Sequence, residues 1–100
     1  MTDPWADLAA RARALADLAD RYAAIAPADL APTADTDPLG ELDTAALEVR
    51  GAVAACRRAT YQALHDLGIP KAEIGRRWGT TGAAVGKVLN RAQTAPAAES

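Results

Sequence analysis

Apolar residues recur at helical spacing in the first part of the chain, over about residues 4–26. The stripe advances by three and four residues and comprises Trp5, Leu8, Ala12, Leu15, Ala19 and Tyr22. Asp3 can cap the N-terminus of this helix, and Pro4 suits the first helical position, where its missing N–H costs nothing. The pattern predicts an amphipathic helix whose stripe must be covered. It can pack on the rest of its own chain, or on the same helix of a second subunit, because Leu8, Leu15 and Tyr22 repeat every seven residues.

A second helical pattern follows a region without periodicity. Residues 27–40 hold three prolines and three aspartates and predict a connecting loop. The second helix is expected to begin near Asp43 or Thr44, either of which can cap it, and to end at Gly68 as a left-handed cap. Its expected apolar stripe comprises Leu42, Ala46, Val49, Val53, Cys56, Thr60, Ala63 and Leu67.

The stretch after Gly68 predicts two short helices joined by a tight turn. The first is expected over Lys71 to Trp78, and the second from Gly82 to about Ala92. Gly79 can take the positive φ of the turn, and Thr81 can cap the second helix. Two steeply crossing helices need apolar contact residues and small residues at the closest approach. The sequence offers Ile74, Trp78, Val85 and Val88 for the contact, Leu64, Leu67 and Ile69 to complete the core, and Gly75 and Ala84 for the close approach.

This arrangement resembles the helix-turn-helix units of sigma-factor region 4, resolvase-type recombinases and many small bacterial regulators. The resemblance covers residues 70–91 and implies that the second helix enters the major groove of double-stranded DNA. It implies outward-facing residues near the bases at Thr81, Gly82, Ala83, Gly86, Lys87 and Asn90. It implies contacts with the DNA backbone from Lys71, Arg76, Arg77, Arg57, Arg58 and Arg91. Because Gly82 and Gly86 have no side chains for base readout, the expected sequence preference is modest.

Charge is divided unevenly along the chain. Residues 1–49 carry ten acidic and three basic residues, whereas residues 50–91 carry eight basic and two acidic residues. A basic half beside an acidic half is typical of a polyanion-binding module with a separate arm, although a solvated mixed surface would give the same balance.

Other candidate chemistry is sparse. Cys56 is the only cysteine, which excludes an internal disulfide, and it falls on an apolar stripe, as a small buried hydrophobe does. His65 is the only histidine, too few ligands for a zinc site. No arrangement of residues suggests catalysis, a metal or a cofactor. Without a signal-peptide pattern or a membrane-span pattern, a cytoplasmic protein is expected.

These patterns together predict an all-α protein of four or five helices. Its expected parts are an arm or oligomerisation helix over 1–26, a loop over 27–40, a helix-turn-helix domain over 41–92 and a disordered tail over 93–100. The expected function is a DNA-binding transcriptional regulator that works as a homodimer, with no enzymatic activity and no membrane partner. The dimer contact is expected on helix 4–26 or on the central helix, since a two-fold pair of recognition helices matches palindromic sites.

Two other classes of function fit the same sequence. A DNA packaging or partition adaptor, such as a small terminase subunit, also pairs a helix-turn-helix with an oligomerising helix. A protein-interaction module, such as an antitoxin or anti-regulator, would instead use an acidic arm that mimics DNA, formed by Asp3, Asp7, Asp17 and Asp20. The acidic segment could also fold over the basic face and compete with DNA.

Overall fold

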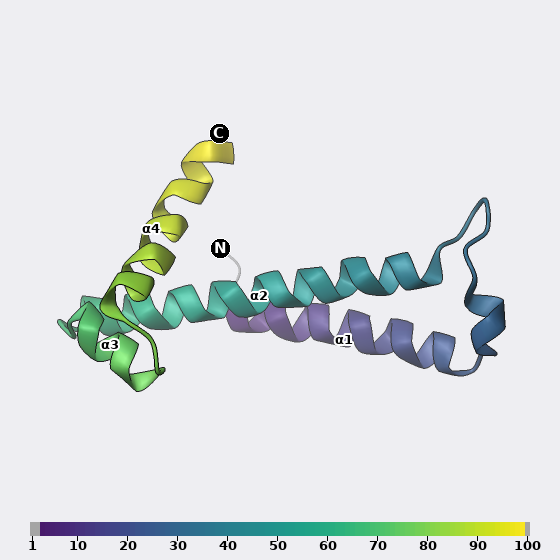
Figure 1. Cartoon of the computed structure of the whole chain (residues 1–100), viewed down its shortest axis with the longest axis horizontal. Coiled ribbons are helices and arrows are strands. Elements are labelled where there is room, and N and C mark those ends of the chain that lie inside the picture. The colour runs from purple at the N-terminus through teal and green to yellow at the C-terminus, as the bar shows by residue number, and fades with distance from the viewer. Residues whose placement is uncertain (1–2, 100) are drawn as a thin grey trace. The chain divides into compact units, whose positions relative to one another are not determined.

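The computed structural model describes the backbone of residues 3–99 and the side chains of residues 3–90. Over these residues all regular secondary structure is helical, without strands, which confirms the predicted all-α class (Figure 1). Its elements are α1 (Pro4–Ala23), the 3-10 turn η1 (Pro27–Leu30), α2 (Pro38–Asp66), α3 (Lys71–Arg77) and α4 (Gly82–Glu99). Among the described residues, none of the helices combines the length and the apolar composition that a membrane span needs.

Contacts within the chain group its residues into two compact units. The first unit is Met1–Ala55 and the second is Cys56–Ser100. Helix α2 contributes most of its length to the first unit and its last turns to the second. Each unit is described separately below.

The first unit is an antiparallel hairpin of α1 and the first part of α2 (Figure 1). Asp3 caps α1 by accepting a hydrogen bond from the backbone N–H of Trp5 at 3.1 Å. Near the middle of α1, Arg11 Nη1 lies 3.1 Å from Glu48 Oε2 of α2. Near the end of α1, the hydroxyl of Tyr22 donates to the carboxylate of Glu41, at the start of α2. Of the expected α1 stripe, Leu8, Leu15 and Tyr22 are therefore half-buried within this unit, whereas Trp5, Ala12 and Ala19 are exposed.

Helix α2 begins earlier than the sequence suggested. It starts at Pro38 rather than at Asp43 or Thr44, and the Oδ1 atom of Asp37 accepts the backbone N–H of Gly40 at 3.1 Å. The physical reason is that an aspartate followed by a proline supplies both a cap and a residue that favours the first helical position. The loop predicted over 27–40 therefore contains the turn η1 and ends at Asp37.

The buried face of α2 also differs from the expected stripe. Val53 is 38% exposed and Leu67 is 77% exposed, although the sequence placed both on the stripe. The residues that face inward follow a spacing of three and four and comprise Leu42, Ala45, Val49, Ala52 and Cys56. The expected stripe was right at Leu42, Val49 and Cys56, but between them Ala45 and Ala52 face inward in place of Ala46 and Val53. Trp5, expected in the core, is likewise 58% exposed.

The second unit has a small, fully enclosed core. Ile74 of α3 and Val85 of α4 are both 0% exposed, and Tyr61 and Leu89 are nearly as buried. Three half-buried apolar residues surround this cluster: Leu64, Ile69 and Val88. The sequence identified Ile74, Val85 and Val88 as contact residues but missed Tyr61 and Leu89.

The backbone of α4 continues to Glu99 instead of ending near Ala92. Residues 92–98 combine four alanines, which favour a helix, with Pro96, which disfavours a helix interior.

Candidate nucleic-acid interface

Two glycine-containing turns frame α3, and both adopt the geometry that the sequence predicted. Gly68 follows α2 with φ of 91°, and Gly79 follows α3 with φ of 68°. After each glycine, the next backbone N–H returns to a carbonyl five residues earlier: Ile69 to Leu64 at 3.2 Å, and Thr80 to Gly75 at 2.7 Å. This is the Schellman motif, which satisfies helix-end carbonyls and reverses the chain sharply. The turns therefore fix where α3 and α4 begin.

Thr81 caps α4, as its position in the sequence predicted. Its Oγ1 atom accepts the backbone N–H of Ala84 at 3.1 Å, and its carbonyl accepts the backbone N–H of Val85. A threonine at this position satisfies a donor that the first turn of a helix otherwise leaves without a partner. The cap therefore anchors the end of α4 that the sequence predicted to approach the bases.

Gly75 allows α3 to lie directly against the turn. The residue is buried, and a Cβ atom added to it would lie 2.7 Å from the carbonyl carbon of Thr81 and 3.0 Å from the carbonyl oxygen of Thr80. Both neighbours are backbone atoms, so neither can move without shifting the turn. The expectation of a small residue at this approach is therefore confirmed for Gly75.

The second close approach is made by Gly82 rather than by Ala84. A Cβ atom on Gly82 would lie 3.0 Å from the backbone nitrogen of Ala72, and one on Gly86 would lie 3.8 Å from the side chain of Lys71. Both glycines are half-buried. They therefore face the start of α3, which corrects the expectation that they point outward with the readout residues. Ala84 lines a surface hollow instead.

The exposed face of α4 carries three of the predicted readout residues. Ala83, Lys87 and Asn90 are exposed and recur at intervals of four and three, which places them on one side of the helix. Thr81 is exposed just before them. Lys71 lies beside this row, because its Nζ atom is 3.8 Å from the position of a Cβ on Gly86. The structure thus groups Thr81, Ala83, Lys87, Asn90 and Lys71 on one surface.

The two arginines that end α3 share one carboxylate. Arg76 forms an ion pair with Glu73, and Arg77 Nε lies 3.5 Å from the other carboxylate oxygen of Glu73. The side chains of Arg76 and Arg77 are 77% and 48% exposed. Exposed ion pairs contribute only about 0–1 kcal/mol, so both guanidinium groups can exchange this carboxylate for another anion at little cost.

The remaining predicted contact residues lie on α2 and at the end of the described side chains. Arg57 is exposed and lines a hollow of about 320 Å³ together with Tyr61, Trp78, Thr80, Ala84 and Val88. In this hollow the Trp78 ring meets Tyr61 edge to face, with ring centroids 5.2 Å apart, and is 48% exposed. The expectation that Trp78 is a core residue is therefore only half met. Arg58 is half-buried, and the side chain of Arg91 lies outside the described residues.

Side chains of the kinds that bind metal ions do not gather into one site in the part of the chain that the structure describes. No three histidine, cysteine or acidic side chains converge there on a metal position. The thiol of Cys56 is buried, and His65 is exposed beside the carbonyl oxygen of Ile69, 3.3 Å from its Nδ1. What the second unit offers is the exposed row Ala83, Lys87 and Asn90 on α4, next to the basic side chains of α3.

No protein-family model, no curated protein and no solved structure matches this chain.

Proposed function

We propose that the protein is a DNA-binding transcriptional regulator that inserts α4 into the major groove of double-stranded DNA and acts as a homodimer. The observation that carries this proposal is the exposed row Ala83, Lys87 and Asn90 beside the capped end of α4. A recognition helix reads bases with residues near its N-terminus, and a lysine and an asparagine are suited to guanine and adenine edges. The alanine methyl group is suited to thymine.

The charges around this row support the same proposal. Over residues 56–90 the second unit carries six basic and two acidic residues, and helix α4 carries no acidic residue before Glu99. Lys71 stands beside the row, and Arg76 and Arg77 end α3 with exposed side chains. Basic side chains around a groove-reading helix hold the phosphates and set the orientation of the protein on the duplex.

The short readout row also favours two copies over one. Three side chains on a single helix give few base contacts, whereas a two-fold pair doubles them and matches palindromic sites. Because Gly82 and Gly86 face α3, no further position on the first turns of α4 adds readout. The proposed regulator therefore has a modest sequence preference per half-site.

Fluorescence anisotropy with a labelled duplex tests the proposal. Neutralising roughly six phosphates per dimer predicts that affinity falls about a thousandfold between about 50 and 200 mM salt. The Arg77→Glu/Lys87→Glu variant is expected to lose this binding. An Arg13→Glu/Arg21→Glu variant, with the same change of charge on exposed residues of α1, is the matched control and is expected to keep it. Absent binding at low salt, or equal loss in both variants, would reject the proposal.

A further inference from the structure

The two helices of the hairpin present two different flanks. Inward-facing positions are Pro4, Leu8, Arg11, Leu15, Leu18 and Tyr22 of α1, and Pro38, Leu42, Ala45, Val49 and Ala52 of α2. Each helical residue advances about 100° around the axis in one rotational sense along the chain. Because α1 and α2 run antiparallel, the residues one position after each inward-facing residue lie on the same flank of the hairpin in both helices. The residues that precede inward positions lie on the opposite flank.

The preceding residues form a flank that we call the polar flank. It comprises Asp3, Asp7, Ala10, Ala14, Asp17 and Arg21 of α1, and Asp37, Glu41, Thr44, Glu48 and Gly51 of α2. On this side Asp7 and Glu48 both bind the guanidinium of Arg11, and the hydrogen bond to Asp7 is the main cause of its raised pKa. The hydrogen bond to Glu41 likewise raises the pKa of the Tyr22 hydroxyl. On the polar flank, the carboxylates of Asp7, Glu41 and Glu48 are therefore paired within the hairpin.

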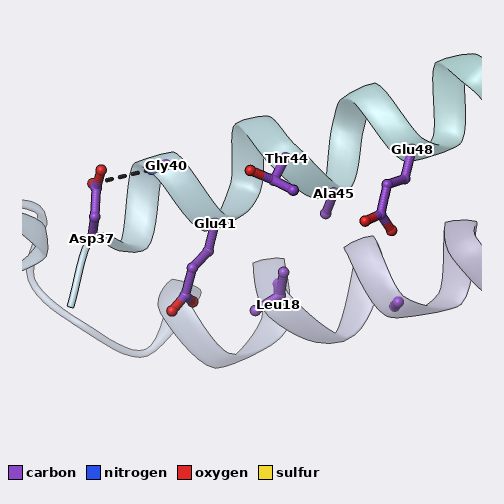
Figure 2. A pocket seen from close by; sticks show the side chains of 8 residues that line it. Leu18, Asp37, Gly40, Glu41, Thr44, Ala45 and Glu48 are labelled. Carbon is purple, nitrogen blue, oxygen red and sulfur yellow. Dashed lines mark hydrogen bonds between the residues drawn. The ribbon is translucent and has the colours of Figure 1, made fainter. Parts of the chain in front are cut away.

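A shallow groove of about 580 Å³ on this flank confirms which residues share it. Its lining combines preceding residues of both helices with Leu18 and Ala45, and Figure 2 shows the side chains of Glu41 and Glu48 directed from α2 toward α1. Since these preceding residues of α1 and α2 meet in one groove, the following residues of both helices lie on the opposite side.

The following residues form the apolar flank. It comprises Trp5, Ala9, Ala12, Ala16, Ala19 and Ala23 of α1, and Leu39, Asp43, Ala46, Arg50 and Val53 of α2. Every member except Ala9 is exposed, and the large side chains of Trp5 and Leu39 are 58% and 56% exposed. The α1 part carries no charge at all. An exposed apolar surface of this kind, edged by polar residues, is typical of an interaction site.

The hairpin lacks a core of its own. We therefore expect another protein surface to pack against its apolar flank. No residue of α1 is buried, and in the part of α2 that belongs to this unit only Pro38 and Ala52 are. Helices in proteins are stabilised mainly by packing an apolar face, and two layers are needed to bury it. Another layer of helices on the apolar flank would supply the missing burial.

The charged residues on the apolar flank indicate that the packing partner is a second copy of this chain. Asp43 and Arg50 stand seven residues apart on either side of Ala46 and Leu47. Consider a two-fold axis that crosses α2 between positions 46 and 47 and relates α2 to an antiparallel copy of itself. Each Asp43 then lies opposite the partner's Arg50. A two-fold interface must be self-complementary in this way. No other charged residue lies on the apolar flank, so the match uses both charges and leaves none unpaired.

The same axis gives a compatible arrangement on α1. The pairs Tyr22–Glu41 and Arg11–Glu48 show which residues of α1 lie beside which residues of α2. Positions 14 and 15 of α1 lie beside positions 46 and 47 of α2, so the same axis crosses α1 there. Ala12 of one copy then meets Ala16 of the other, which allows close approach of the two helices. Trp5 falls opposite the partner's small residues near Ala23, where its large ring has room.

We propose that two hairpins associate through their apolar flanks into a two-fold, antiparallel four-helix bundle, with Asp43 paired to Arg50 across the interface. This deepens the proposed function, whose two-fold DNA site rests on a dimer. The occupant is a second copy of this chain, and the interface lies in the first unit, separate from the residues proposed to contact DNA.

Sedimentation equilibrium of the full chain without DNA tests the interface. The wild type is expected at twice the 10.3 kDa mass of one chain. Ala16→Arg places two like charges at the centre of the interface and is expected to give monomers. Ala10→Arg, the same change on the polar flank, is the matched control and is expected to stay dimeric. Helicity by circular dichroism checks that each variant folds.

Charge reversal then tests the register. Asp43→Arg and Arg50→Asp are each expected to raise the dimer dissociation constant about tenfold, because each replaces two attractive pairs by two repulsive ones. Combining both in one chain restores the pairs and is expected to restore the dissociation constant. A monomeric wild type, equal effects of Ala16→Arg and Ala10→Arg, or no rescue by the double reversal would overturn the inference.

The DNA measurement separates this inference from the proposed function. Lys87→Glu is expected to weaken DNA binding without changing the mass in solution. A wild type that is dimeric through this interface but does not bind DNA would reject the function and leave the inference standing. A monomeric wild type that binds DNA would do the opposite.

Discussion

The two units of this chain bury their apolar residues to very different degrees. In the second unit Ile74 and Val85 are 0% exposed, and three short segments close completely around them. In the first unit α1 has no buried residue, and Trp5 is 58% exposed. Two helices that touch along one line cannot enclose large side chains, whereas crossing helices joined by tight turns can. The second unit is therefore a module with its own core, whereas the hairpin leaves large apolar side chains exposed.

The two units also differ in whether a glycine can be replaced by a larger residue. Gly75 and Gly82 of the second unit lie against backbone atoms, while Gly51 of the hairpin has nothing within 4 Å of an added Cβ. The following predictions test this contrast, beginning with the largest effect.

Truncating the core of the second unit is expected to be the most damaging change. Ile74→Ala removes a fully buried side chain and is expected to lower the free energy of unfolding by about 2–5 kcal/mol. Leu47→Ala in the hairpin removes a side chain that is 66% exposed and is expected to change it by less than about 0.5 kcal/mol. Urea unfolding followed by circular dichroism compares the two. Similar losses would mean that the contrast in burial is wrong.

Replacing a glycine by alanine is expected to change the free energy of unfolding in opposite directions at Gly75 and Gly51. Gly75→Ala forces a Cβ against the backbone of Thr81 and is expected to destabilise the protein by about 1–3 kcal/mol. Gly51→Ala meets open space inside a helix and is expected to stabilise it by up to about 1 kcal/mol. Thermal unfolding of both variants measures the difference, and a neutral Gly75→Ala would show that the turn does not lie against α3.

The hairpin is expected to gain stability with protein concentration if it completes its core in a dimer. Each tenfold rise in concentration then adds about 1.4 kcal/mol to the unfolding free energy of the associated form. The Ala16→Arg variant is expected to lose this dependence, while Ala10→Arg keeps it. An unfolding midpoint that is independent of concentration in the wild type would argue against association.

The smallest expected effect concerns the carboxylate that pairs with both arginines of α3. Glu73→Gln frees Arg76 and Arg77 for phosphate and is expected to raise DNA affinity a few-fold, since each exposed ion pair contributes only about 0–1 kcal/mol. Anisotropy titrations of the variant and the wild type at one salt concentration give the ratio. Asp66→Gln, which removes an exposed acid from the end of α2, is the control for net charge. An equal gain in both variants would assign the effect to charge alone.

The sequence predicted the turns of the second unit well because their signals are local. Gly68, Gly79 and Thr81 act on the backbone within a few residues of themselves, and all three do what their positions implied. The presence of the helices could be predicted equally well, because apolar spacings of three and four residues continue over many residues. Such features do not depend on what the rest of the chain does.

The choice between neighbouring alanines on α2 and the roles of the glycines were not accessible in the same way. Alanine is only weakly apolar, so Ala45 and Ala52 could not be distinguished from Ala46 as inward positions by hydrophobicity. Gly82 was assigned to the readout face because periodicity alone cannot say which residue meets the backbone of another helix. Both depend on the crossing of helices, which is a tertiary property.

Chemical-shift mapping of the labelled protein with a DNA duplex tests most directly whether α4 contacts the major groove. Amide shifts are expected to concentrate at the start of α4 and along Ala83, Lys87 and Asn90, with smaller shifts at Lys71 and at the end of α3. Residues of α1 are predicted to stay unchanged. Shifts concentrated in α1, or an unchanged spectrum in low salt, would contradict the account.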